Sequence, residues 1–295
     1  MARSTQALVL AADGGGTRCR LAASDGGRVV SVEAGAANAS TDFDGAVREV
    51  TQATHRLAER MGQPVETLLA APAFVGLAGV TGPVIAERLR DALPFRHVRV
   101  ADDRIAGVRG ALGRRDGVVA HCGTGSFFAS QRGGAIRLSG GWGPVLGDEA
   151  SAQWVGRTAL GLALKAEDGR LAPSSMTARI LADFGDAAGV VRFAGTAGPS
   201  DLGALAPLVT EYAQSGDTVA ELILRQAAED IADALRHLGW RPGEAVCLTG
   251  GIGPNFRRYL ADDLRACLSA PEGEPIDGAL SLARDFAREI ADGHR

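Results

Sequence analysis

Cysteine is scarce in this sequence, and its spacing predicts neither a disulfide framework nor a metal site. None of the four cysteines belongs to a C-x-x-C pair; they are Cys19, Cys122, Cys247 and Cys267. Three of them lie in apolar stretches, where a free thiol behaves as a small hydrophobic side chain. We therefore expect buried structural cysteines and a reducing, cytoplasmic environment, in which unpaired thiols are common.

Long hydrophobic runs are also missing. The most apolar stretch, Leu68 to Val80, is interrupted by Pro72 and two glycines. It is shorter than the roughly 18 apolar residues that a membrane helix needs. Residues 1–6 contain no apolar core of the kind found in secretory signals. We expect no membrane partner.

Neither sign of charge is in large excess. The chain has 31 Lys and Arg against 35 Asp and Glu, for a net charge of −4, and the two signs are interspersed. A nucleic-acid or anionic membrane partner requires a concentrated basic surface. We therefore expect no nucleic-acid partner either.

Length and glycine content indicate what the chain is. Its 295 residues suggest about two domains and allow a hydrophobic core that needs no disulfides. Its 40 glycines are many, and glycine is common where a turn or a close approach of the backbone is needed. The glycine turns are therefore candidate functional positions.

Short apolar runs alternate with longer segments of helical periodicity, as in α/β proteins. The predicted strands are Ala7–Ala12, Cys19–Ser24, Arg28–Glu33, Phe74–Leu77, Val98–Ala101, Val118–His121, Phe127–Ser130, Ala135–Leu138 and Ala245–Leu248. Helical spacing is found in Phe43–Met61, in much of Ala150–Gly239, and in Pro275–Ala291. The pattern predicts an α/β fold with a helical C-terminal part.

The two halves of the chain share a pattern of strand, glycine-threonine turn, strand, glycine turn and strand. A shift of 107 residues places Gly16-Thr17 on Gly123-Thr124 and Gly26-Gly27 on Gly133-Gly134. This indicates an internal duplication that gives two similar lobes, each offering a glycine turn to a shared cleft. We predict an N-terminal lobe of residues 1–109, with 277–295 packing back on it, and a C-terminal lobe of residues 110–276.

The first chemical motif is Asp13-Gly14-Gly15-Gly16-Thr17, directly after a predicted strand. Glycines let backbone N–H groups approach phosphate oxygens closely, and Thr17 adds a hydroxyl donor. A carboxylate beside phosphates is repelled unless a cation intervenes, so Asp13 implies Mg²⁺. The alternative is an ordinary hairpin turn.

Two further glycine turns also follow apolar strands. Gly123-Thr124-Gly125-Ser126 repeats the phosphate-binding chemistry of the first motif, so the two turns could hold one triphosphate. Thr249-Gly250-Gly251 leaves room for a flat ring or a ribose against the backbone. A plain strand-to-helix turn is the alternative for this third motif.

Asp102-Asp103 follows another predicted strand. A carboxylate here could accept the proton of an attacking hydroxyl during phosphoryl transfer. Aspartate is also a good helix N-cap. The residues alone leave open which aspartate is the base and which is the cap.

The segment Gly140–Glu149 places Trp142 among glycines, before Asp148 and Glu149. An indole offers an apolar face and one donor, and carboxylates accept hydrogen bonds from hydroxyls, so this set suits a polar ring. The alternative is a structural loop in which an acid caps the next helix.

These motifs, in this order, make the chain resemble the N-acetylglucosamine kinase and glucosamine kinase branch of the BadF/BadG/BcrA/BcrD ATPase family. The resemblance covers nearly the whole chain, and its most specific part is Gly141-Trp142-Gly143 followed by Gly147-Asp148-Glu149. It implies a two-lobed, actin-like (ribonuclease H-like) fold. It also implies an ATP-dependent kinase that phosphorylates the 6-hydroxyl of N-acetylglucosamine or glucosamine.

The resemblance also implies a role for individual residues. Asp103 would be the catalytic base, and Asp13 would organise Mg²⁺. The residues implied to hold ATP are Gly14, Gly15, Gly16, Thr17, Gly123, Thr124, Gly125, Gly250 and Gly251. The residues implied to contact the amino sugar are Asn38, Asp103, Gly141, Trp142 and Asp148.

The chain lacks two motifs of related groups, which favours the kinase branch of the family. The cysteines do not fit the iron–sulfur pattern of the family's dehydratase and reductase activators, and the zinc motif of the neighbouring ROK sugar kinases is absent. The alternatives are a nucleotide-driven switch that acts on a partner enzyme and a non-catalytic sugar sensor. The sequence does not distinguish N-acetylglucosamine, glucosamine and another hexose. A homodimer is an expectation at the level of the family only.

Overall fold

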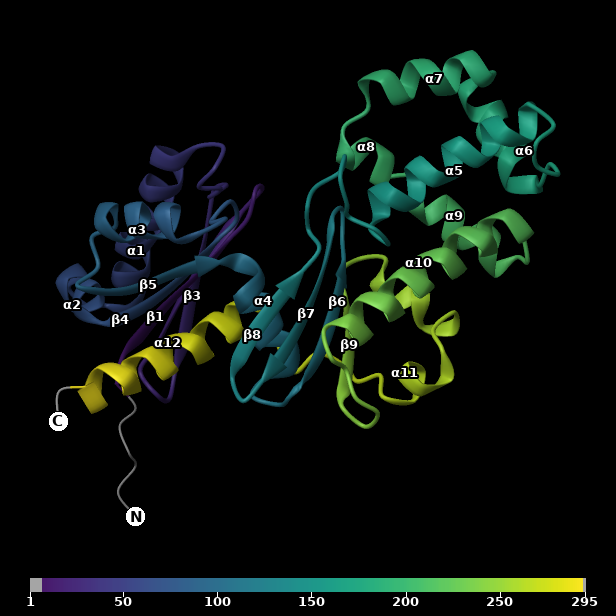
Figure 1. Cartoon of the computed structure of the whole chain (residues 1–295). Helices are drawn as coiled ribbons and strands as arrows, with labels where there is room; N and C mark the ends of the chain where they lie inside the picture. The colour runs from purple at the N-terminus through teal and green to yellow at the C-terminus, as the bar shows by residue number, and fades with distance from the viewer. Residues whose placement is uncertain (1–6, 294–295) are drawn as a thin grey trace. The chain divides into compact units, whose positions relative to one another are not determined.

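The computed structural model describes residues 7–293 and divides the chain into two compact units. Unit 1 comprises the residues up to Arg114 together with those from Glu272 onward. Unit 2 comprises Arg115–Pro271. The chain therefore passes from unit 1 to unit 2 and later returns (Figure 1).

Unit 1 contains a five-stranded sheet in the order β3-β2-β1-β4-β5. Its elements are β1 (Val9–Gly14), β2 (Cys19–Ser24), β3 (Val29–Ala34), α1 (Phe43–Met61), α2 (Val65–Ala70), β4 (Pro72–Leu77), α3 (Pro83–Ala92), β5 (His97–Asp102), α4 (Asp103–Leu112) and α12 (Pro275–Gly293). β1 pairs antiparallel with β2 and parallel with β4. The carboxyl ends of β1, β4 and β5 therefore lie at one edge of the sheet.

Both faces of this sheet are covered by helices of unit 1. One core joins apolar strand residues to α1, α2 and α3, with Val50, Leu68 and Leu89 buried in it. A second core joins the opposite face to α4 and α12. The first helix, α1, has clear end signals: the side chain of Asp42 caps its N-terminus, and Gly62, with φ +67°, ends it.

Unit 2 contains a four-stranded sheet in the order β8-β7-β6-β9. Its elements are β6 (Gly117–Cys122), β7 (Ser126–Arg132), β8 (Ala135–Ser139), α5 (Ala152–Glu167), α6 (Ser175–Phe184), α7 (Ala187–Thr196), α8 (Pro199–Gly203), α9 (Ala206–Gln214), α10 (Thr218–His237), β9 (Ala245–Thr249), the 3₁₀ helix η1 (Gly253–Arg258) and α11 (Asp262–Ala266). One core joins a face of this sheet to α5, α10 and the smaller helices. The periodic apolar stripe of α10, including Ile223, Ala227 and Ile231, lies in this core.

The two sheets repeat one strand pattern. In unit 1, Leu21 of β2 lies opposite Val32 of β3. In unit 2, Phe128 and Ser139, which stand 107 positions later, lie opposite each other on β7 and β8. Each sheet also adds a parallel strand beside its first strand, β4 beside β1 and β9 beside β6. The topology therefore supports the internal duplication predicted from the sequence.

The copies differ by one residue in the glycine-threonine turn. Residues 15–18 connect Gly14 to Cys19, whereas residues 123–125 connect Cys122 to Ser126. The strand before the turn is consequently offset by 108 positions rather than 107. His121, opposite Phe127, therefore occupies the place that Asp13, opposite Arg20, occupies in unit 1.

The α/β class and the helical C-terminal part are as predicted. Apart from Cys19–Ser24, the predicted strand limits need corrections of one or two residues. The first strand was predicted as Ala7–Ala12, but β1 begins at Val9 and extends to Gly14. The extension arises because Asp13 and Gly14 pair with residues of both β2 and β4.

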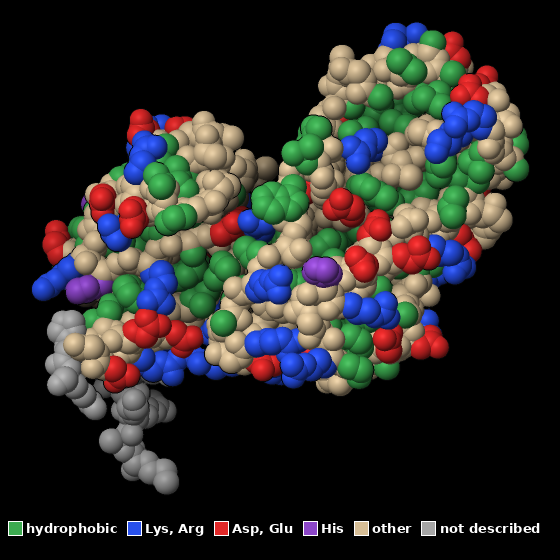
Figure 2. Space-filling model, in the orientation of Figure 1, with side chains coloured by type: hydrophobic (Ala, Val, Ile, Leu, Met, Phe, Trp, Pro, Cys, Tyr) green, Lys and Arg blue, Asp and Glu red, His purple; other side chains and the backbone are tan. Residues whose placement is uncertain are grey.

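Other whole-chain expectations concern membranes, cysteines and surface charge. Within residues 7–293, no helix is both long and apolar enough to cross a bilayer. The four cysteines are free thiols; three are buried, and Cys267 is partly exposed. Acidic, basic and hydrophobic side chains are interspersed over the face shown in Figure 2.

Candidate active site

Asp13 lies near the carboxyl end of β1, in the middle of the unit 1 sheet. It is paired with Arg20 on β2 and with Gly76 on β4. Burial raises the pKa of Asp13 to about 6, although the charges of Arg20 and Arg18 oppose this rise. A carboxylate that is costly to ionise here is stabilised by a cation, which fits the predicted metal role.

The glycines after Asp13 serve two different purposes. A Cβ on Gly14 would stand 2.4 Å from Leu77 Cδ2 and 3.1 Å from the Ala37 Cβ, so Gly14 is needed for packing. A Cβ on Gly15 would meet its nearest neighbouring atom at 3.7 Å, and one on Gly16 would meet nothing within 4 Å. Packing therefore gives no reason for a glycine at position 15 or 16, and the exposed Gly16 is the position whose backbone is open to a ligand.

The turn itself is held by backbone bonds. The Gly15 N–H donates to the Arg18 carbonyl over 2.9 Å, and the Gly15 carbonyl accepts from the Ala37 N–H over 3.0 Å. Gly16 and Thr17 are exposed at its tip. The tip thus combines a fixed frame with accessible donors, as a phosphate-binding turn requires.

Asp102 and Asp103 have distinct environments. Asp102 is the N-cap of α4 and accepts from the Arg104 N–H over 2.9 Å; it also accepts from the Arg104 guanidinium Nη2 over 2.6 Å. Burial favours a raised pKa for Asp102, but these hydrogen bonds outweigh it and lower the pKa below its usual value. Asp102 is therefore a charged helix cap whose carboxylate is hydrogen-bonded to Arg104.

Asp103 is the first residue of α4. Its burial, followed by the nearby charges of Asp102 and Asp13, raises its pKa to about 7. A carboxyl group with a pKa near neutrality is well suited to accept a proton. The two environments therefore favour Asp102 as the helix cap and Asp103 as the candidate base, a choice that the sequence left open.

Gly76 is a site residue that the sequence reasoning missed. It pairs with Asp13 on β1 and with Ala101 on β5. A Cβ on Gly76 would stand only 3.3 Å from the Cα of Asp103. The absent side chain thus lets α4 begin close to β4. The only available signal was a glycine inside an apolar strand, which indicates a close approach of another backbone.

Asn38 lies in the loop before α1 and forms a bridge to Ala78, just beyond β4. Its Oδ1 accepts from the Ser40 N–H over 3.0 Å and from the Ser40 hydroxyl over 2.8 Å. Gly79, with φ +81°, leaves space for this amide. Because the carbonyl end is engaged in the loop, the side-chain NH₂ is the end that can donate to a sugar.

In unit 2, the turn 123–125 is joined to the start of α5. The Gly123 carbonyl accepts from the Ala152 N–H over 2.8 Å, and the Thr124 carbonyl accepts from the Gln153 N–H over 3.4 Å. A Cβ on Gly125 would stand 2.8 Å from Asp148 Oδ2. This turn is therefore positioned by helix α5 and by Asp148.

Asp148 is 7 % exposed and has the left-handed φ of +60°. Its Oδ1 accepts from the Gly143 N–H over 3.1 Å, and its Oδ2 lies 3.3 Å from Gln153 Nε2, which donates to it. Burial raises the pKa of Asp148, although backbone donors including Gly143 and Ser126 oppose the rise. In this structure Asp148 connects the tryptophan loop to β7 and α5. Its predicted sugar contact stays a prediction.

The loop containing Gly141 and Trp142 presents apolar side chains to solvent. Trp142 is 75 % exposed, and Val145 and Leu146 are exposed to a similar extent. Gly141 has φ +72°, a conformation that favours glycine. An exposed indole held by a glycine-rich loop is a candidate platform for a sugar ring.

Gly250 and Gly251 also differ from each other. Gly250 has φ +79°, and a Cβ there would lie 2.3 Å from the Cys122 backbone, so only glycine fits. A Cβ on Gly251 would meet nothing within 4 Å. Gly250 therefore holds the end of β9 against the end of β6, and Gly251 is the open position.

His121 is a second residue that the sequence reasoning missed, because a lone histidine in an apolar strand reads as core. Its Nδ1 lies 3.1 Å from Thr249 Oγ1, and its ring stacks on Phe127 with centroids 5.0 Å apart. Burial lowers the pKa of His121. A neutral imidazole thus connects the turn at Gly123 with the turn at Thr249–Gly251.

The predicted residues accordingly form two groups, one in each unit. In unit 1 the structure brings Asp13, Gly15–Thr17 and Asp103 to the carboxyl ends of β1 and β5, with Asn38 on the adjoining loop. In unit 2 the second group contains the two glycine turns, and Asp148 joins the first of them to the tryptophan loop.

The chemistry of unit 1 fits a magnesium–nucleotide complex better than a protein-enclosed metal. Within residues 7–293, no group of three or more His, Cys, Asp or Glu side chains could hold a metal ion. Mg²⁺ is often bound by one or two carboxylates and completed by phosphate oxygens and water. Asp13 is the carboxylate predicted to hold the metal in this way, and its charge also raises the pKa of the candidate base Asp103.

Comparison with known proteins gives consistent matches. Residues 12–280 match the model of the BadF/BadG/BcrA/BcrD ATPase family. A glucosamine kinase of Vibrio cholerae is 28% identical over 275 residues, which cover 92% of this chain and 94% of that protein. These matches extend over nearly the whole chain.

Solved structures resemble this one in the same way. A Chromobacterium violaceum protein, to which N-acetylglucosamine kinase activity is ascribed, has a TM-score of 0.78 and 34% identity, covering 94% of this chain and 98% of that chain. A ROK family glucokinase from Streptomyces griseus, crystallised with glucose and AMPPNP, has a TM-score of 0.53 and 19% identity, covering 96% and 99% of the two chains. The predicted two-lobed, actin-like fold is thereby confirmed.

Proposed function

The chain belongs to the BadF/BadG/BcrA/BcrD ATPase family, and from this membership we propose that it is an ATP-dependent amino-sugar kinase. The observation that carries the proposal is the environment of Asp103. Its pKa is raised to about 7 at the start of α4, close enough to Asp13 for the two charges to interact. A base and a metal-organising acid at the ends of β1 and β5, the two strands that flank β4, are what phosphoryl transfer to a hydroxyl requires.

Residues of each group are assigned a part in binding ATP. The turns Gly15–Thr17 and 123–125 are assigned to its phosphate oxygens, chiefly through their exposed residues Gly16, Thr17 and Thr124, and Gly251 is assigned to the adenosine. Asp13 would hold Mg²⁺, which neutralises charge on the phosphates when bound. Asp103 accepts the proton of the sugar hydroxyl as that oxygen attacks the γ-phosphorus and ADP leaves.

The sugar is assigned to Asn38, Trp142, Gly141 and Asp148 together with Asp103. The free NH₂ of Asn38 can donate to a hydroxyl or to an N-acetyl carbonyl, and the exposed face of Trp142 can pack on the ring. The acceptor is proposed to be the 6-hydroxyl of glucosamine or N-acetylglucosamine. The named relatives support this substrate class.

A coupled assay of ADP release tests the proposal. Glucosamine, N-acetylglucosamine, glucose and a sugar-free control are compared, and NMR of the product locates the phosphate. We expect an amino sugar to stimulate ADP release and the product to carry phosphate on oxygen 6. Phosphate on another oxygen would correct the acceptor only. ATP hydrolysis that ignores sugar would instead indicate a nucleotide switch, and sugar binding without turnover would indicate a sensor.

A further inference from the structure

Helix α4 carries Asp103 at its first residue and packs along α12, which follows it by more than 160 positions in the sequence. The two helices approach closely through glycines. A Cβ on Gly110 would stand 2.3 Å from the Glu274 carbonyl oxygen, and one on Gly278 would stand 2.0 Å from the Ala106 carbonyl oxygen. Backbone therefore meets backbone where the helices cross, and few side chains determine their relative orientation there.

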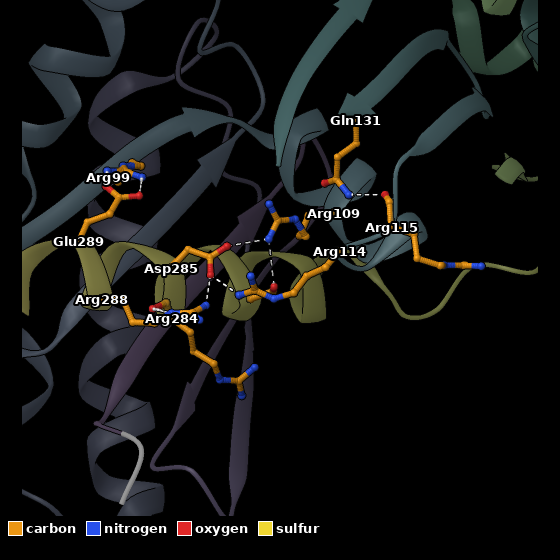
Figure 3. A network of polar contacts seen from close by, with 10 residues as sticks. Arg99, Arg109, Arg114, Arg115, Gln131, Arg284, Asp285, Arg288 and Glu289 are labelled. Atoms are coloured by element: carbon orange, nitrogen blue, oxygen red, sulfur yellow. Dashed lines mark hydrogen bonds and ion pairs between the residues drawn. The ribbon is translucent and has the colours of Figure 1, made fainter. Parts of the chain in front are cut away.

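One ion pair between a buried arginine and a partly exposed aspartate joins these helices beyond the crossing. Arg109 of α4 is 4 % exposed, and its Nη1 donates to Asp285 Oδ2 of α12 over 2.7 Å. The same nitrogen lies 3.3 Å from the Ser281 hydroxyl. Asp285 also pairs with Arg114, just after α4, and with Arg288 on α12. Figure 3 shows Asp285 reaching toward these arginines.

A second ion pair on α12 provides a contrast. Glu289 pairs with Arg99 over 2.5 Å, but both side chains are largely exposed, and Arg99 belongs to β5 (Figure 3). Exposed pairs of this kind contribute little to stability or orientation. The Arg109–Asp285 pair is different because a buried charge that loses its partner must move or be resolvated.

We infer that Arg109 and Asp285 form a positioning pair that fixes the orientation of α4 and thereby places Asp103 for proton transfer. The inference rests on the proposed function. Arg109 lies less than two helical turns after Asp103, about 9 Å along the helix axis. A helix that short moves as one body, so a shift at Arg109 is transmitted to its first residue.

A purely stabilising role does not require these residues. Replacing a buried ion pair by apolar side chains of similar volume is often neutral or stabilising, whereas an ion pair with directed hydrogen bonds selects one geometry. The glycine crossing already brings the helices together without them. The ion pair adds a constraint that fixes one angle between α4 and α12.

The test compares D285N, the double variant D285N/R109M, D285E and the control E289Q by steady-state kinetics well below the unfolding temperature. We expect kcat to fall about 10- to 100-fold in D285N, the size of effect that a misplacement of about 1 Å can produce. KM for ATP should change by less than about threefold, because the residues assigned to ATP lie elsewhere. D285E should recover part of kcat, and E289Q should behave as wild type.

The double variant separates positioning from charge balance. Because it leaves no buried charge unpaired, its unfolding temperature should return close to wild type while its kcat stays low. Wild-type kcat in the folded double variant would overturn the inference.

Hydrogen exchange of the helix-bonded amides of α4, residues 106–110, tests the inference independently of activity. Exchange should accelerate in D285N and in the double variant but not in E289Q. Unchanged exchange would overturn the positioning role. If wild-type protein phosphorylates no sugar, the proposed function fails, yet the exchange measurement still decides whether the pair fixes α4.

Discussion

The two units share a sheet pattern but differ in charge at equivalent positions. In unit 1, β1 carries Asp13 near its end, and the neighbouring Asp103 has a pKa raised to about 7. In unit 2, the position equivalent to Asp13 is His121, whose pKa burial lowers. The same strand pattern thus carries two carboxyl groups with raised pKa values in unit 1 and a neutral imidazole in unit 2. We expect the chemistry in unit 1 and mainly ligand holding in unit 2.

The largest difference should come from Asp103. Asp103→Asn removes the proton acceptor and is expected to lower kcat about 10²- to 10⁴-fold, the usual range for a general base. KM for ATP should stay nearly constant, because the glycine turns are intact. Asp102→Asn should cost much less, since asparagine also caps helices well. Steady-state kinetics of both variants make the comparison, and a larger loss in D102N would reverse the two roles.

The next contrast is between Asp13 and its counterpart His121. Asp13→Asn should raise the Mg²⁺ concentration needed for half-maximal rate and lower kcat/KM about 10²-fold, typical of a lost transition-state contact. His121→Asn should change kcat/KM less than about tenfold, mostly through KM for ATP. Rates measured across a magnesium titration test this pair. Equal magnesium dependence in both variants would contradict the assignment of the metal to unit 1.

Glycine substitutions should separate packing from ligand contact in both units. Gly14→Ala and Gly250→Ala should lower the unfolding temperature, because each new Cβ meets atoms within 2.4 Å; overpacking of this kind costs about 1–3 kcal/mol. Gly16→Ala and Gly251→Ala have open space and should keep wild-type stability. Thermal unfolding and KM for ATP are the measurements. A raised KM without a stability loss in the second pair would support ligand contact.

The smallest expected effect concerns acid stability. Arg109 and Arg114 lower the pKa of Asp285 against the opposing effect of its burial. A carboxyl group with a lowered folded-state pKa stabilises the protein above its unfolded-state pKa of about 3.9, and this contribution is lost as the pH falls further. Unfolding free energies from pH 7 to pH 3 should therefore converge for wild type and D285N at the acid end. If the difference in unfolding free energy between wild type and D285N were constant across this range, protonation of Asp285 would not contribute to acid unfolding.

Local patterns predicted much of the architecture. β2 was predicted with its observed limits, Cys19–Ser24, because its apolar run ends at an Asp-Gly turn. Helix α1 likewise begins at Phe43 and ends at Met61, between a capping aspartate and a left-handed glycine. These signals lie within a few residues of the element they define. The sequence is therefore sufficient to place them.

Features that depend on distant residues could not be predicted in the same way. Asp285 reaches Arg109 across 176 positions. The predicted sugar ligand Asp148 also contacts Gly125 and Gln153, which residue type alone does not indicate. Glycines in one motif also looked alike in sequence, although packing requires Gly14 and leaves Gly16 unconstrained. Tertiary proximity, rather than residue type, makes these distinctions.

Because Gly76 has no side chain, Asp103 can lie close to the strands that carry Gly76 and Asp13. Because a Cβ there would stand 3.3 Å from the Asp103 Cα, even one methyl group would move the start of α4 by a few tenths of an ångström. Such a replacement would leave every group that contacts substrate chemically unchanged. Position 76 is therefore a geometric control by which selection, or an engineer, could tune how strongly the charge of Asp13 raises the pKa of Asp103.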